Sequence, residues 1–196
     1  MESIAEIKKV FADADISEYS GLIEKYGDDE RDGVKKIIAS AQKKINALEK
    51  EKARSYKMFE FERKYADKGY ICGIDEAGRG PLAGPVVAGA VVLPKDCRIL
   101  YVNDSKKLSE KKREMLYDVI LNEAVSVGVG IVSPERIDEI NILNATYEAM
   151  REAINNLTVK PDILLNDAVT IPGVDIEQVP IIKGDAKSLS IASASI

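Results

Sequence analysis

The chain contains no histidine, and only two of its 196 residues are cysteine. Without histidine, the Ser-His-Asp and Cys-His nucleophile systems, histidine zinc sites and a histidine general base are all excluded. Cys72 and Cys97 lie in or beside apolar stretches and lack zinc-site spacing, so we expect buried free thiols rather than a disulfide. Chemistry in this protein must therefore rest on carboxylates, lysines, hydroxyls or a bound metal ion.

Long apolar runs are also missing. None approaches the ~20 residues that span a bilayer, and the N-terminal segment carries acidic residues where a signal peptide needs a basic start and an apolar block. Hydrophobic residues make up 45% of the chain and charged residues 31%, which is typical of a folded globular protein. We therefore expect a cytoplasmic protein with no membrane partner.

The net charge of −5 argues at first against a nucleic-acid partner. Residues 1–70, however, carry equal numbers of basic and acidic side chains, so the acidic excess lies in the remainder of the chain. If several of those acids surround divalent cations, the effective surface is much less negative. Net charge therefore leaves the kind of partner open.

The residue pattern changes at Gly69. Residues 1–68 are polar and rich in lysine and glutamate. From Val34 to Leu48 apolar residues recur in steps of four and three, which predicts an amphipathic helix that we expect to run to about Tyr65. Two shorter helices, over residues 4–12 and 16–26, are expected to pack on its apolar stripe. We interpret residues 1–68 as a helical N-terminal extension that is separable from residues 70–196.

Beyond Gly69, short β-branched runs alternate with helical stretches. Strands are predicted over residues 70–74, 86–93, 125–132, 162–165 and 178–182, and helices over 109–124, from Pro134, over 141–157 and over 186–196. This order predicts an α/β or α+β domain with helices packed against a sheet.

Four acidic residues lie at the ends of these predicted strands or in the turns that follow: Asp75, Glu76, Asp167 and Asp185. Side chains at strand ends can converge on one edge of a sheet, and carboxylates that do so repel each other unless cations lie between them. Oxygen ligands without histidine or cysteine suit magnesium or manganese. Two such ions, ~3.5–4 Å apart, can activate a water and stabilise the leaving oxygen of a phosphodiester.

Each of these acids also has an ordinary explanation. Asp75, Glu76 and Asp167 could be solvated turn residues, and Asp185 could cap the helix that follows it. Adjacent side chains in a regular strand face opposite ways, so Asp75 and Glu76 share a site only if the strand ends or twists there. The glycines just downstream would allow such a departure. The residues alone leave both interpretations open.

Four segments, in order along the chain, resemble the motifs of type 2 ribonucleases H. They are residues 74–90 (IDEAGRGPLAGPVVAGA), 104–108 (DSKKL), 140–150 (INILNATYEAM) and 182–196 (IKGDAKSLSIASASI). The resemblance covers residues 70–196 almost continuously. Residues 1–68 resemble the helical extension that some bacterial members carry.

The resemblance implies a ribonuclease H-like mixed sheet flanked by helices, and an endonuclease that cuts the RNA strand, or a single embedded ribonucleotide, in an RNA–DNA duplex. It implies two magnesium or manganese ions held by Asp75, Glu76, Asp167 and Asp185. Gly78, Arg79 and Gly80 would read the 2′-hydroxyl, the group that distinguishes RNA from DNA. The remaining expected substrate contacts are Lys106, Lys107, Asn144, Lys183 and Ser188. A solvated surface is the alternative for Lys107 and Asn144. We expect a monomer.

The chain also departs from the family pattern. Members usually continue beyond the position of Ile196, so the resemblance implies a catalytic domain, residues 70–196, that is C-terminally incomplete and lacks a tyrosine that stacks beside the cleavage site. This leaves two rival functions: an impaired fragment that binds hybrid duplexes without cutting them, and a different metal-dependent nuclease or phosphatase. The Gly-Arg-Gly segment argues against the second.

Overall fold

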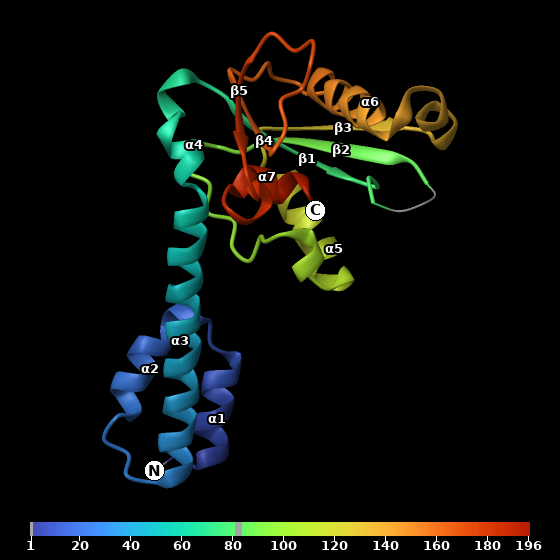
Figure 1. The fold of residues 1–196 in the computed structure, drawn as a ribbon. Coiled ribbons are helices and arrows are strands. Elements are labelled where there is room, and N and C mark those ends of the chain that lie inside the picture. Colours follow the sequence, from blue (N-terminus) through green and yellow to red (C-terminus); the bar gives the residue numbers. More distant parts are fainter. Residues whose placement is uncertain (1, 81–83) are drawn as a thin grey trace. The chain divides into compact units, whose positions relative to one another are not determined.

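A computed structural model describes residues 2–80 and 84–196 (Figure 1). Residues 81–83, which belong to the first of the four motifs, lie outside the described residues. The chain forms two compact units, Met1–Ala53 and Arg54–Ile196. Among the described residues, no helix combines the length and the apolar character needed to cross a membrane.

The N-terminal unit is helical. It contains α1 (Ile4–Asp13), a 3-10 turn (Ile16–Glu18), α2 (Tyr19–Tyr26) and the first part of α3, which begins at Asp32. Ser3 and Glu6 form a capping box in which each side chain accepts the other residue's backbone N–H. The predicted packing of the short helices on the long one is confirmed by one buried cluster: Ile7, Phe11, Tyr19, Tyr26, Val34 and Ala41.

The long helix ends earlier than the apolar pattern predicted. α3 runs from Asp32 to Met58, and the backbone leaves helical geometry at Phe59 (φ −89°, ψ 15°) before α4 (Glu60–Lys64) and a 3-10 turn (Ala66–Lys68). A single helix to Tyr65 was therefore wrong. Met58 and Phe59 are buried in a core cluster of the second unit. The compact units thus divide after Ala53, fifteen residues before the boundary that the sequence pattern suggested.

The second unit contains a mixed five-stranded sheet. Its strands are β1 (Ile71–Ala77), β2 (Val86–Val92), β3 (Ser126–Val132), β4 (Ile163–Asp167) and β5 (Glu177–Ile181), in the order β3-β2-β1-β4-β5. β2 is antiparallel to β1 and β3, whereas β4 is parallel to β1 and β5. The predicted mixed sheet is confirmed, with β1 at its centre.

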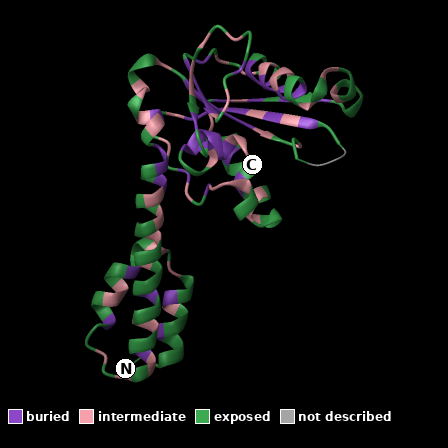
Figure 2. Cartoon of the chain, in the orientation of Figure 1, coloured by how far each residue is buried: buried purple, intermediate pink, exposed green. Residues whose placement is uncertain are grey.

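Helices cover both faces of this sheet (Figure 1). α6 (Pro134–Asn155) packs on β2 and β3, α7 (Leu189–Ala194) packs on β1 and β2, and α5 (Glu110–Glu123) contributes to the same core cluster as α7. Figure 2 shows buried residues gathered along the strands and in α7. Two glycines let these helices approach closely, because a Cβ on Gly130 would overlap the backbone of Ala149 and one on Gly73 would overlap that of Ser190.

α6 is broken at Asn141, whose backbone is non-helical and has a positive φ (φ 67°, ψ 162°). The Asn141 side-chain oxygen accepts the N–H groups of Leu143 and Asn144, both at 3.1 Å, and so caps the second half of the helix. The sequence had placed the start of a helical stretch at this residue, and that start is confirmed.

Two deletions should separate the N-terminal unit from the sheet unit. Removing residues 1–53 should leave the fold of the sheet unit intact. Removing residues 1–68 also takes away the buried Met58 and Phe59, and should lower the free energy of unfolding by at least about 3–5 kcal/mol, the usual cost of losing one large core side chain. Urea denaturation followed by circular dichroism measures both. Equal unfolding midpoints for the two deletions would contradict the observed boundary.

Candidate active site

Asp75 and Glu76 lie inside β1, not after it as the sequence suggested. Pairing with β2 continues through both residues, with Asp75 opposite Gly89 and Glu76 opposite Ala88. The predicted strand end at Ile74 was wrong, because the antiparallel partner supplies hydrogen bonds whatever the side chains are. Strand alternation then directs Asp75 to the face that carries α7, as for Gly73, and Glu76 to the opposite face.

Asp167 is the last residue of β4 and lies beside Asp75. β1 and β4 are parallel, with Ile74 paired to Asn166, so the next residue of each strand is an aspartate. The Asp167 carboxylate accepts the Gly184 N–H at 2.7 Å. That hydrogen bond ties the end of β4 to the 3-10 turn Gly184–Ala186, which carries Asp185.

These carboxylates influence one another. Asp75 is 9% exposed, and burial, followed by the charges of Glu76, Asp167 and Asp185, raises its pKa to about 7. Burial also raises the pKa of Asp185, and the next contributions come from Asp104 and Asp167. The charges of Glu76, Asp167 and Asp185 thus all act on Asp75, although strand alternation directs Glu76 to the opposite face of the sheet. That the four acids share one site stays a prediction. The structure adds Asp104, the first residue of the 104–108 motif, which was not picked out from the sequence as a site residue.

The donor set fits a hard divalent cation, since it consists of carboxylate oxygens, and neighbouring carboxylates help to raise the pKa values of Asp75 and Asp185. In the described parts of the chain, however, no group of three or more acidic or cysteine side chains is arranged so that it could hold an ion. Two of the carboxylates are turned toward backbone donors: Asp75 accepts the Glu76 N–H at 2.9 Å, and Asp167 accepts the Gly184 N–H.

The Gly-Arg-Gly segment follows β1 directly. Gly78 has φ +89°, and a Cβ there would overlap the Pro85 carbonyl oxygen, so this glycine is required by the fold. Gly80 differs, because a Cβ there would meet no described atom within 4 Å. Arg79 is exposed, and its guanidinium lies 3.3 Å from the Glu76 carboxylate. Of the two glycines, Gly80 is the one whose small size is not explained by packing against the described residues.

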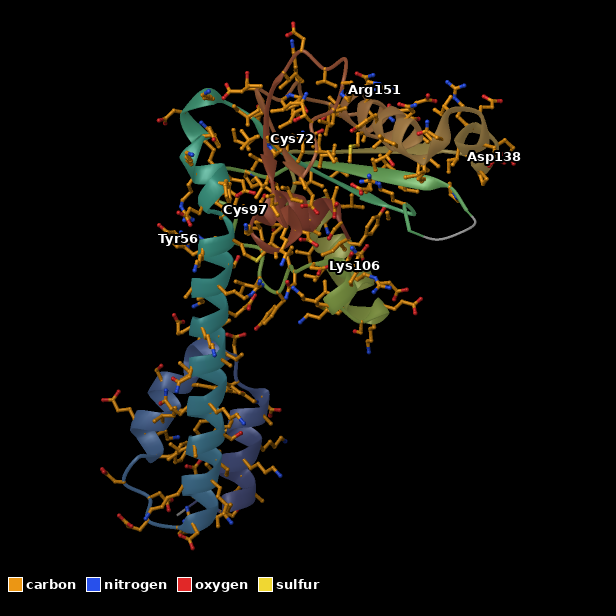
Figure 3. All side chains as sticks on the ribbon, in the orientation of Figure 1. Tyr56, Cys72, Cys97, Lys106, Asp138 and Arg151 are labelled. Atoms are coloured by element: carbon orange, nitrogen blue, oxygen red, sulfur yellow. The ribbon has the colours of Figure 1, made fainter. Side chains whose placement is uncertain are left out.

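The predicted phosphate-binding lysines are exposed. Lys106 precedes α5 (Figure 3) and lies near enough to Asp185 to counteract the rise in its pKa. Lys107 lies 3.7 Å from Asp104. Lys183 adopts a left-handed backbone (φ 58°) just before the turn that carries Asp185. Lys106 and Lys183 therefore flank the acidic group, and their contact with phosphate stays a prediction.

Two other predicted substrate contacts lie in different settings. Asn144 is exposed on α6, and its amide donates to the Ile140 carbonyl at 2.9 Å. Ser188 is fully buried, and its hydroxyl donates to the Glu62 carboxylate at 2.6 Å. In this arrangement the Ser188 hydroxyl is engaged inside the protein and is not presented to a duplex. No sequence pattern pointed to Glu62, which lies 126 positions earlier in the chain.

Both cysteines are free thiols, as expected, and both are labelled in Figure 3. Cys72 is buried, and burial raises its pKa to about 12. Cys97 is only partly buried, and burial raises its pKa as well. A thiol with a raised pKa stays protonated and is a poor nucleophile, so neither cysteine competes with the carboxylates as a reactive group.

Solved structures with this fold are ribonucleases H. Ribonuclease H2 from Pyrococcus horikoshii OT3 matches with a TM-score of 0.56 and 31% identity over 64% of this chain and 68% of that one. The ribonuclease HII in a PCNA:RNase HII complex from Archaeoglobus fulgidus matches with a TM-score of 0.54 and 34% identity over 64% of this chain and 69% of that one. The sheet unit therefore has the ribonuclease H fold.

Family models and curated relatives show which family of ribonucleases H the chain resembles. The Ribonuclease HII model matches residues 72–196, and the Ribonuclease HII N-terminal domain model matches residues 3–66. Ribonuclease HII of Lachnoclostridium phytofermentans is 62% identical over 98% of this chain and 76% of that protein, and that of Clostridioides difficile is 54% identical over 100% and 77%. The chain belongs to the ribonuclease HII family, endoribonucleases that hydrolyse RNA in RNA–DNA hybrids.

Replacing Asp75 by asparagine should stabilise the metal-free protein at alkaline pH. The pKa of Asp75 is higher in the folded chain than its ordinary value of 3.8, so its favourable contribution is complete below about pH 4 and is lost as the pH rises through about 7. In EDTA, Asp75→Asn should gain on the order of a few kcal/mol over wild type at pH 8 and nothing at pH 4.

Urea denaturation at both pH values measures this difference. The control is Asp175→Asn, which changes an exposed loop carboxylate and should show no gain at either pH. A wild-type protein that is as stable as Asp75→Asn at pH 8 would show that Asp75 is not under electrostatic strain.

Proposed function

We propose that this chain cleaves the RNA strand, or a single embedded ribonucleotide, in an RNA–DNA duplex, with Asp75, Glu76, Asp167 and Asp185 holding two magnesium or manganese ions. The observation that carries the proposal is the placement of Asp75, within β1, next to Asp167, the last residue of the parallel strand β4, with the Asp185 turn tied to Asp167 through Gly184. We further propose that it acts as a monomer in the cytoplasm.

The chain's own residues have distinct tasks in this proposal. When bound, the divalent cations supply Lewis-acid activation of water and charge stabilisation at the leaving oxygen. Asp75, the most buried of the four carboxylates, would supply ligand oxygens from β1, while Asp167 would supply them from the end of β4 and Asp185 from the 3-10 turn that follows β5. Lys106 and Lys183 lie beside this group and would meet phosphate oxygens.

Selection of ribose would fall to Gly78, Arg79 and Gly80. A 2′-hydroxyl both donates and accepts hydrogen bonds, and a backbone can reach it only where no side chain intervenes. The open space around Gly80 supports this assignment, because no described part of the protein fills it. The exposed Arg79 guanidinium lies 3.3 Å from the Glu76 carboxylate, which links this segment to one of the four acids.

Cleavage of a duplex that contains one ribonucleotide tests the function directly. In magnesium or manganese the chain should cut at the ribonucleotide and leave an all-DNA duplex intact. Asp75→Asn should reduce the rate by about 1,000-fold or more, since stabilisation of transition-state charge by a bound cation is worth several kcal/mol. Binding of the duplex without any cutting by wild type would favour the impaired hybrid-binding fragment. Cutting of the all-DNA duplex would favour a different metal nuclease.

A methyl group at Gly80 should weaken recognition of the ribose. We expect Gly80→Ala to lower kcat/KM on the single-ribonucleotide duplex by about threefold to tenfold, the value of one or two hydrogen bonds, with an unchanged thermal midpoint and unchanged manganese affinity. Gly78→Ala is the matched comparison, because the positive φ and the Pro85 contact predict a loss of stability instead. A Gly80→Ala protein that lost manganese affinity but kept normal substrate selection would contradict the assignment.

A further inference from the structure

Glu62, on α4, is a buried carboxylate that the proposed chemistry does not use. Its side chain is 4% exposed. One carboxylate oxygen, Oε1, accepts three hydrogen bonds: from the Ser188 hydroxyl at 2.6 Å, the Ser190 hydroxyl at 2.6 Å and the Ser190 backbone N–H at 2.8 Å. All three donors lie between the Asp185 turn and the first residues of α7. The hydrogen bonds of Glu62 therefore all come from one short segment of the chain.

This segment leads directly to Asp185. The Ser188 hydroxyl donates to Glu62 and also accepts the Ile191 N–H at 3.2 Å, which makes Ser188 the N-cap of α7. The Ser188 backbone N–H donates to the Gly184 carbonyl at 2.8 Å and closes the 3-10 turn that contains Asp185. Ser188 thus joins Glu62, the start of α7 and the Asp185 turn in one hydrogen-bonded unit.

The same segment also contacts the strand that carries Asp75. The Ser190 backbone lies so close to Gly73 that a Cβ on this glycine would overlap it. Gly73 is two residues before Asp75 and faces the same side of the sheet. Glu62 therefore fixes a segment that touches β1 at one residue and carries Asp185 on the turn before it.

Stability alone is a weak reason for a buried carboxylate. Burying a charge is costly, and well-packed apolar side chains often stabilise a core equally well. Among the described residues, the second oxygen, Oε2, has no hydrogen-bond partner. The segment that holds Ser188 and Ser190 uses only Oε1, as the acceptor of three hydrogen bonds. The side-chain carbonyl oxygen of a neutral glutamine can fill the same place.

We propose that Glu62 is a positioning residue for the active site: through Ser188 and Ser190 it sets the place of the Asp185 turn relative to Asp75 in β1. This inference rests on the proposed function, because it assumes that Asp75 and Asp185 act on the same cations. It assigns a role in the catalytic unit to a residue that lies within the part of the chain matched by the N-terminal family model.

The test compares Glu62→Ala and Glu62→Gln with wild type in two assays, at a temperature where all of the proteins are folded. Steady-state cleavage gives kcat and KM, and electron paramagnetic resonance of free manganese gives the manganese affinity without substrate. Glu62→Ala should lower kcat about tenfold or more and weaken manganese binding about threefold, with KM for the duplex changed less than twofold. Glu62→Gln, which keeps the acceptor, should stay within about threefold of wild type in kcat.

Ile154→Ala is the matched control for lost stability. Ile154 is a buried residue of α6, which covers the face of the sheet opposite α7. This variant should therefore lower the thermal midpoint but keep kcat and manganese affinity. Wild-type kcat and manganese affinity in Glu62→Ala would overturn the proposal. So would a loss in Glu62→Gln as large as that in Glu62→Ala, because the acceptor would then not be what matters.

If Glu62→Ala does not fold, Ser190→Ala takes its place. It removes one of the three donors and should give a smaller change of the same kind, a lower kcat and weaker manganese binding at unchanged KM; wild-type values would overturn the proposal. Failure of the proposed function is distinguishable, because wild type itself would then not cleave the single-ribonucleotide duplex. The manganese titration would still decide whether Glu62 acts on the carboxylates.

Discussion

Carboxylates crowd together at the end of the parallel pair β1 and β4, and the rest of the sheet unit is built to hold them there. Asp75 is nearly buried, and its pKa of about 7 corresponds to about 4 kcal/mol by which the fold disfavours its charged form. The register of β4 on β1 places Asp167 next to Asp75, and the hydrogen bond from the Gly184 N–H to Asp167 holds the turn that carries Asp185 near them. A fold that places like charges together at this cost is suited to binding cations, and functional sites commonly carry such strain.

Close backbone packing makes this arrangement rigid. Gly73 lets the backbone of α7 approach β1, and Gly130 lets the backbone of α6 approach β3, so a helix lies close against each face of the sheet. On the α7 face, the hydrogen bonds from Ser188 and Ser190 to Glu62 bring in a residue from α4. Residues 54–66 match the N-terminal family model but belong to the compact unit that carries the carboxylates. The boundary between the two compact units, after Ala53, therefore differs from the boundary between the two family models, which lies between residues 66 and 72.

The local patterns predicted much of this fold, and the failures have physical causes. All five strands were found from β-branched runs and turn residues. The end of β1 was misplaced because Asp75 and Glu76 look like turn residues, whereas pairing with β2 carries the strand through them. The break at Phe59 was missed because an apolar residue is compatible with the helical pattern whichever core it packs into. Here it packs into the core of the sheet unit. Ser188 was assigned to the substrate because a sequence does not show that Glu62 lies beside it.

The most direct test of the account is the number of manganese ions that the chain binds, with Asp75→Asn as the comparison. If the four carboxylates form one cation site, wild type titrated in the presence of an uncleavable RNA–DNA duplex should bind two ions, and Asp75→Asn should lose at least one of them. Binding of two ions by both proteins, or of none by wild type, would contradict the claim that these carboxylates are held together in order to bind cations.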